Sequence, residues 1–69
     1  MSYSFDAQGF RELREERGLT REAVGVACGR SSETVREWER GPHEPKERVV
    51  PLIADLLGVS INELRRRVA

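Results

Sequence analysis

The sequence predicts an all-α fold, a compact domain of five short helices, and three observations support this. Apolar residues recur at intervals of three and four, residues that cap helices precede these segments, and glycines follow most of them. Runs that alternate apolar and polar residues are missing, so we expect no strand. A chain of 69 residues has room for one core, and we expect a single domain over residues 1–69.

The first two helices are expected in the N-terminal half of the chain. Ser4 or Asp6 can cap a helix through "DAQGFRELREER", which Gly18 ends. Thr20 can cap a second helix, "REAVGVA". Gly29 then supplies the positive φ that ends this helix, because glycine has no Cβ to obstruct that conformation. We therefore predict two helices separated by a short turn.

The third and fourth helices are expected on either side of the loop "GPHEPK". Ser31 caps a helix over residues 32–40, and Gly41 ends it. The fourth helix is predicted over residues 49–57. It contains Pro51, which is tolerated only in the first helical turn, where its missing N–H is not needed.

A fifth helix, "INELRRRV", is predicted at the end of the chain. Ser60 and Glu63 have the spacing of a capping box, in which each side chain satisfies a backbone N–H of the other residue. We expect the arginines at 65–67 to lie at the C-terminal end of this helix, where positive charge is favourable.

Composition excludes several classes of function. Twelve basic and twelve acidic residues balance, so the chain as a whole does not attract nucleic acid. A single cysteine leaves no internal disulfide or cysteine-rich zinc site, and we expect no cofactor and no metal. No nucleophile–base pair is evident, so we do not expect an enzyme. Neither a membrane span nor a signal peptide is found, and a cytoplasmic protein is expected.

The predicted second and third helices, joined by "CGRS", have the length and glycine placement of a helix-turn-helix unit. At 100° per residue, Val35 and Trp38 point toward the other helices. The opposite side of the helix carries only charged residues at the corresponding positions, namely Glu33, Arg36, Glu37 and Arg40. In DNA-binding units of this kind, the outward side of the second helix enters the major groove.

At this point "LREERGLTREAVGVACGRSSETVREWERG" and the later "IADLLGVSINEL" resemble the Cro/XRE family of lambda-repressor-like DNA-binding domains. The resemblance covers residues 10–64 and includes "RGLT", "WERG" and "LGVS" at the family's spacing. It implies five helices, binding of double-stranded operator DNA, often as a homodimer, and control of transcription, frequently in phages or mobile elements.

The resemblance also implies roles for individual positions. The base-reading positions, with the arginine beside them, are Ser32, Glu33, Arg36 and Glu37. The positions that contact the DNA backbone are Arg21, Ser31, Arg40, His43 and Lys46. Arg30 stands where the family usually has a small or apolar residue, and it could reach a phosphate too. Arg14 and Glu39 match a family pair that forms a buried ion bridge with a structural role.

Two glutamates on a face intended for DNA require an explanation. A carboxylate can accept from cytosine N4, but phosphates nearby repel it. We expect Glu33 to pair with Arg36 and Glu37 with Arg40, since each pair is three residues apart on the helix. Such pairs hold the arginines extended and penalise wrong base sequences through unpaired charge. The alternative is a protein-binding module, such as an antitoxin or regulatory partner, that keeps the fold without strong DNA affinity.

A dimer contact is expected near the end of the chain. Leu52 is predicted to be exposed on the fourth helix. Together with Val59, Ile61 and Val68 it could form an apolar patch for a second copy.

Overall fold

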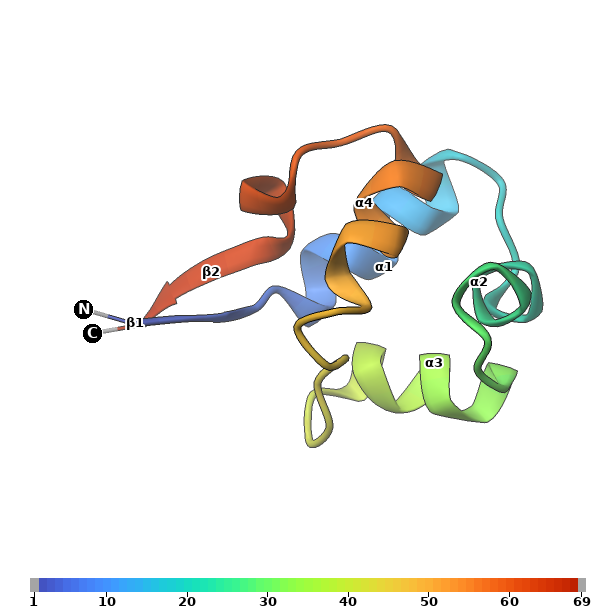
Figure 1. Ribbon diagram of the computed structural model, residues 1–69, viewed down its shortest axis with the longest axis horizontal. Helices are drawn as coiled ribbons and strands as arrows, with labels where there is room; N and C mark the ends of the chain where they lie inside the picture. Colours follow the sequence, from blue (N-terminus) through green and yellow to red (C-terminus); the bar gives the residue numbers. More distant parts are fainter. Residues whose placement is uncertain (1, 69) are drawn as a thin grey trace.

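The computed structural model describes residues 2–68, in which four α-helices form a bundle and the two chain ends pair as a ribbon (Figure 1). The elements in chain order are β1 (Ser2–Phe5), α1 (Ala7–Glu16), α2 (Arg21–Cys28), α3 (Ser32–Arg40), α4 (Val50–Leu57), the 3-10 helix η1 (Ile61–Leu64) and β2 (Arg65–Val68). The expected all-helical bundle is therefore confirmed in its main part, and both ends differ from the prediction.

The predicted fifth helix is wrong, and so is the expectation that no strand occurs. The capping box of Ser60 and Glu63 does form, but it starts a single 3-10 turn, and Arg65 then adopts extended backbone angles. Residues 65–68 pair antiparallel with residues 2–5. Backbone pairing between the chain ends prevails over the local helix signal, and places the arginines in a strand rather than at a helix end.

The other predicted helix boundaries are confirmed closely. The Asp6 carboxylate accepts from the backbone N–H of Gly9 at 3.0 Å, and Thr20 accepts from Ala23 at 3.0 Å. Gly29 ends α2 at φ +69°. The fourth helix begins one residue later than expected, at Val50, and has no side-chain cap. Local capping chemistry therefore decides where most of these helices begin and end.

The core lies where all four α-helices meet and is centred on two aromatic rings. Phe10 of α1 and Trp38 of α3 are almost completely buried, and their ring centroids lie 6.4 Å apart in an edge-on arrangement. Phe5 of β1 packs on Phe10 at 5.4 Å and attaches the ribbon to this core. The aromatic contacts therefore fix one side of α3 against the bundle and leave its other side for solvent.

Gly25 in α2 lies against the backbone of the turn that follows this helix. A Cβ at this position would lie 2.5 Å from the carbonyl oxygen of Arg30 in the turn. The backbone carbonyl of Gly25 accepts a hydrogen bond from the backbone N–H of Arg30, with 2.8 Å between nitrogen and oxygen. The turn between α2 and α3 can close this tightly because position 25 lacks a side chain.

The apolar patch expected near the end of the chain is not continuous. Leu52 is 46 % exposed, as predicted, but Val59 and Ile61 pack against the core. The side chain of Val68 lies outside the described residues. Among the side chains that the structure describes, Val26 on α2 is the most exposed large apolar one, at 78 %.

Candidate nucleic-acid interface

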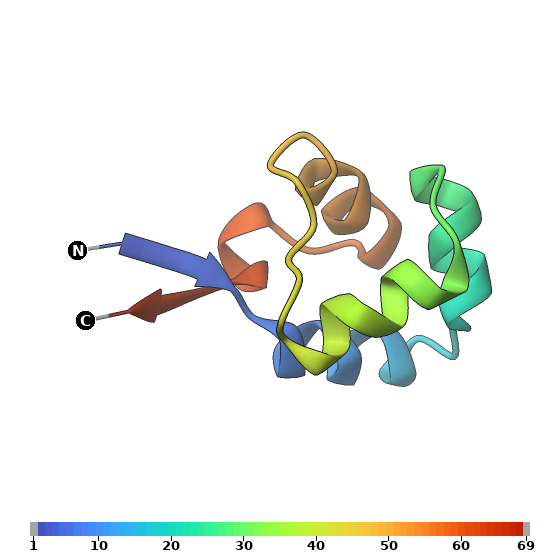
Figure 2. The same cartoon turned by 90° about the horizontal axis from the view of Figure 1, so that it is seen from below.

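The outward side of α3 is the candidate interface, and it is uncovered along the length of the helix. Figure 2 shows α3 lying across the front of the bundle with no other element over it. Ser32, Glu33, Arg36 and Arg40 are exposed, while Val35 and Trp38 on the opposite side are buried. The predicted orientation of the helix is confirmed for these residues, while Glu37, also predicted on the outward side, is only partly exposed.

The N-terminal end of α3 is fixed by its cap. The Ser31 hydroxyl accepts from the backbone N–H of Thr34 at 3.2 Å and lies 3.1 Å from the Thr34 hydroxyl. The other N–H groups of the first turn point outward along the helix axis without intrahelical partners. Such groups favour an anion such as phosphate.

One of the two expected glutamate–arginine pairs on this face is present. The Arg36 guanidinium donates to Glu33 at 2.9 Å, and both side chains remain about half or more exposed. Glu37 and Arg40 make no ion pair with each other in the described part of the chain. Among the described residues, the Glu37 carboxylate therefore forms no ion pair with a basic side chain.

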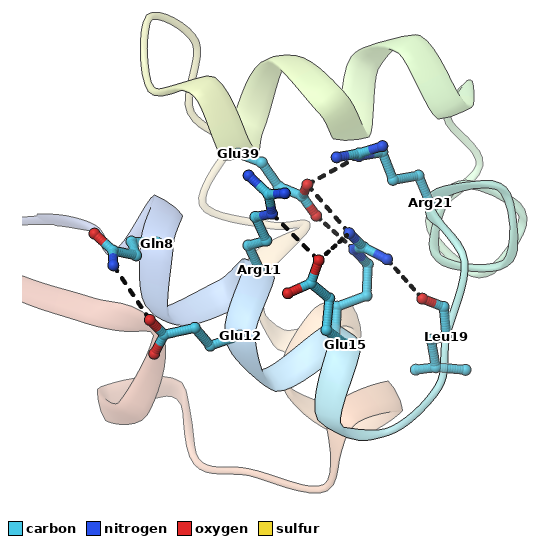
Figure 3. A network of polar contacts seen from close by, with 8 residues as sticks. Gln8, Arg11, Glu12, Glu15, Leu19, Arg21 and Glu39 are labelled. Carbon is cyan, nitrogen blue, oxygen red and sulfur yellow. Dashed lines mark hydrogen bonds and ion pairs between the residues drawn. The ribbon is translucent and has the colours of Figure 1, made fainter.

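Behind this face, Glu39 at the end of α3 binds two arginines from different helices (Figure 3). Nε of Arg14 lies 2.5 Å from Glu39 Oε2, and Nε of Arg21 lies 2.9 Å from Glu39 Oε1. The glutamate side chain is 2 % exposed and that of Arg14 is 9 % exposed. Arg14 also donates to the Leu19 carbonyl at 2.7 Å. The buried ion pair expected between Arg14 and Glu39 is present in this geometry.

The sequence predicts a different partner for Arg21, the second arginine that binds Glu39. Arg21 is predicted to contact a phosphate, and here its Nε donates to Glu39 while its side chain stays 36 % exposed. No sequence signal pointed to this pair, because the two residues are 18 positions apart. The contact leaves the terminal nitrogens of Arg21 for another acceptor.

The remaining predicted backbone contacts lie on either end of α3. Arg30 is exposed in the turn before the helix and donates to the neighbouring Gly29 carbonyl at 3.1 Å. His43 and Lys46 are exposed in the loop after the helix. The folded chain thus places these basic side chains before and after a helix whose outward face is polar.

Cys28 belongs to the core and not to this face. Its side chain is buried, and burial raises the pKa of the thiol, an effect that the charge of Arg30 partly offsets. Among the described residues, no three histidine, cysteine, aspartate or glutamate side chains are grouped so that they could hold a metal ion. No helix among residues 2–68 is long and apolar enough to cross a bilayer.

Comparison with protein families matches residues 7–67 to the family described as a helix-turn-helix domain. No curated protein matches the chain.

An epoxidase and a repressor are among the solved structures that share the fold. Hydroxypropylphosphonic acid epoxidase from S. wedmorenis, in complex with fosfomycin, is 31 % identical with a TM-score of 0.78 over 87 % of this chain and 32 % of that chain. The cobalt form in complex with substrate is 30 % identical, with a TM-score of 0.80 over 91 % of this chain and 35 % of that chain. This chain therefore spans about a third of the epoxidase chains it matches.

The P22 c2 repressor in complex with a synthetic operator is 23 % identical, with a TM-score of 0.81 over 88 % of this chain and 92 % of that chain. The likeness extends over nearly the whole of both chains and shows that the two proteins share a fold.

Proposed function

Because the chain belongs to the helix-turn-helix domain family, we propose that it is a sequence-specific regulator that binds duplex DNA. Within that family we assign it to the Cro/XRE branch, from the residues that carry the resemblance. In this proposal α3 enters the major groove, and the protein acts on operator DNA as a homodimer whose half-sites lie about 34–36 Å apart.

The observation that carries the proposal is the uncovered polar face of α3. A helix whose inner face is fixed by Val35 and Trp38 and whose outer face is exposed can enter a groove without rearrangement of the core. The bases would be read by the residues near its N-terminal end and middle, namely Ser32, Glu33, Arg36 and Glu37. Base edges supply the sequence information, so these side chains would set the preferred operator.

The backbone contacts would come from residues around the helix. The candidate side chains are Arg21, Arg30, Ser31, Arg40, His43 and Lys46. Phosphate contacts hold the protein in register on the duplex and make its affinity depend on salt. The cap of α3 adds backbone N–H groups that can share a phosphate with a nearby arginine.

The glutamates would reduce binding to wrong sequences. The Arg36 guanidinium already donates to Glu33 at 2.9 Å. Contact with DNA would therefore favour Arg36 only where a base supplies an acceptor of its own. Glu37 has no such partner among the described side chains, and in this proposal its carboxylate would accept from a cytosine amino group. Repulsion between Glu37 and nearby phosphates would weaken binding wherever that cytosine is absent, which favours discrimination over affinity.

A salt titration tests the proposal. Binding of random duplexes, followed by sequencing, first gives the preferred site, and affinity for that site is then measured at several salt concentrations. The proposal expects log K to fall with log salt with a slope equivalent to three or more neutralised phosphates, each contributing about 0.9. No binding at about 50 mM salt would contradict it.

A protein-binding module is the second candidate function, and the charge of the outward face favours it. This face of α3 carries as many carboxylates as guanidinium groups. The titration separates the candidates, because a module of this kind would show no duplex binding that depends on salt and base sequence.

A further inference from the structure

The ribbon formed by the chain ends has two outer edges. β1 and β2 make a two-stranded sheet, and within residues 2–68 no third strand pairs with either of them. Figure 1 shows the ribbon extending from the helical bundle at the end away from α2. A pair of strands alone is only marginally stable in water, and an open edge offers backbone groups to a further strand.

The register decides which backbone groups face outward. The N–H of Asp6 donates to the Leu64 carbonyl at 2.8 Å and so points toward the partner strand, while the Asp6 carbonyl accepts from Phe10 in the first turn of α1. Along an antiparallel strand, the backbone N–H and C=O groups of successive residues point alternately toward the partner strand and away from it. With this register the backbone groups of Ser4 point toward β2, and those of Tyr3 and Phe5 point outward. On β2 the outward positions are Arg65 and Arg67 by the same alternation.

The two outer edges are not equivalent. The backbone N–H of Arg65 is already used, since it donates to the Asn62 carbonyl. A second β2 strand would also bring arginines directly opposite arginines, and like charges in that position are destabilising. β1, with the sequence "SYSF", carries no charge. The outer edge of β1 is therefore the one suited to a further strand.

We propose that the outer edge of β1 is the surface through which two copies of this chain dimerise, in a four-stranded sheet with the order β2–β1–β1–β2. Antiparallel pairing about a two-fold axis at Ser4 would place Tyr3 of each copy opposite Phe5 of the other. These pairs use the outward groups just identified and form four backbone hydrogen bonds. The edge is self-complementary, as a two-fold interface requires.

The inference gives a surface to the homodimer of the proposed function, and in that respect it rests on that function, but it can be tested without DNA. In this register the two Ser4 residues form a pair without hydrogen bonds, with Cα atoms about 4.5 Å apart. That separation lies within the range of a disulfide. On β2 the corresponding central residue is Arg66, which provides a matched control.

The first experiment uses Ser4→Cys and Arg66→Cys in a Cys28→Ala background of the full chain, each equilibrated without DNA in a glutathione redox buffer. We expect disulfide-linked dimer to be most of the Ser4→Cys protein and at least tenfold less abundant for Arg66→Cys. Equal cross-linking of the two variants, or none for Ser4→Cys, would overturn the proposal.

A second experiment measures self-association by sedimentation equilibrium. Tyr3→Pro removes one outward N–H of β1, and Arg67→Pro removes the outward N–H at the paired position of β2, so both disturb the ribbon alike. We expect the dimer dissociation constant to rise at least tenfold for Tyr3→Pro and to change less than that for Arg67→Pro. A monomeric wild type, or equal effects of the two variants, would contradict the inference.

Duplex binding by the same proteins keeps the two proposals apart. Salt-dependent binding with no β1-edge dimer leaves the DNA-binding function standing and removes the dimer surface. A β1-edge dimer that binds no duplex would support the dimer surface and contradict the DNA-binding function.

Discussion

Arg14 on α1 and Glu39 at the end of α3 form a buried ion pair, with Nε 2.5 Å from Oε2 and both side chains less than a tenth exposed. The carboxylate also accepts from Arg21 on α2. One glutamate therefore joins three helices, and its position behind the outward face of α3 fixes that helix relative to the rest of the bundle.

Glu39→Ala is expected to destabilise the fold by about 3 kcal/mol, because it leaves the buried Arg14 without a carboxylate. Urea unfolding measures the loss. Glu12→Ala, an exposed glutamate on α1, is the control and should change the free energy of unfolding by less than about 0.5 kcal/mol. Similar losses for the two variants would show that the ion pair has no special structural role.

Gly25→Ala is expected to destabilise the protein by about 1–3 kcal/mol, although alanine is the better helix former. The added Cβ would lie 2.5 Å from the backbone oxygen of Arg30, and the turn must move to relieve the clash. Thermal unfolding checks this. Ala27→Gly on the exposed side of α2 isolates the propensity difference, with an expected loss of about 1 kcal/mol. A more stable Gly25→Ala protein would contradict this account of the turn.

Glu37→Ala is expected to strengthen binding to random duplexes. It should also reduce the ratio between the affinity for the preferred site and the affinity for random duplexes. The change removes a carboxylate that pairs with no described basic side chain, and so reduces repulsion from phosphates. Titrations of both duplexes at fixed salt measure the two affinities. Glu16→Ala, an exposed change on α1, should leave both unchanged. If Glu37→Ala behaves like this control, Glu37 does not face DNA.

Arg21→Gln is expected to reduce the salt dependence of duplex binding by about 0.9 in the slope, the contribution of one phosphate. Its stability cost should be small, because Glu39 keeps its contact with Arg14. Arg11→Gln, which removes an exposed arginine of α1, is the control. An unchanged slope for Arg21→Gln would mean that Arg21 serves only the ion pair with Glu39.

Stability is expected to fall at alkaline pH through Cys28. Burial raises the pKa of this thiol in the folded state above its value in the unfolded chain. The unfolded state therefore loses its proton first, and the contribution of the neutral thiol, complete below the unfolded pKa, is lost as pH rises through the folded pKa. Urea unfolding between neutral and alkaline pH should show this decrease in the wild type and a smaller one in Cys28→Ala. Identical pH profiles would contradict it.

The helix boundaries could be predicted from the sequence because their causes are local. Asp6, Thr20 and Ser31 cap helices through bonds to residues three positions ahead, and Gly29 and Gly58 end helices by positive φ. The outward orientation of α3 followed from periodicity alone. The pair between Glu33 and Arg36 was also predictable, since both residues lie on one helix.

Other features depend on residues that are far apart in the chain. The C-terminal residues 65–68 form a strand only because residues 2–5 lie beside them, and neither segment has a strand pattern of its own. The contact of Arg21 with Glu39 likewise needs two helices to meet before either residue shows its partner. The expected pair of Glu37 and Arg40 had the right spacing, and the described side chains do not form it.

The amino-acid sequence by itself determined the four α-helices, the side-chain caps of α1, α2 and α3, and the polar outward side of α3, because hydrogen bonds and periodicity within a few residues set them. Only the tertiary structure decided that Glu39 holds two arginines and that the chain ends form a ribbon with an uncharged open edge. Those features arise from contacts across the folded chain, where the free energy of pairing distant groups exceeds local preference.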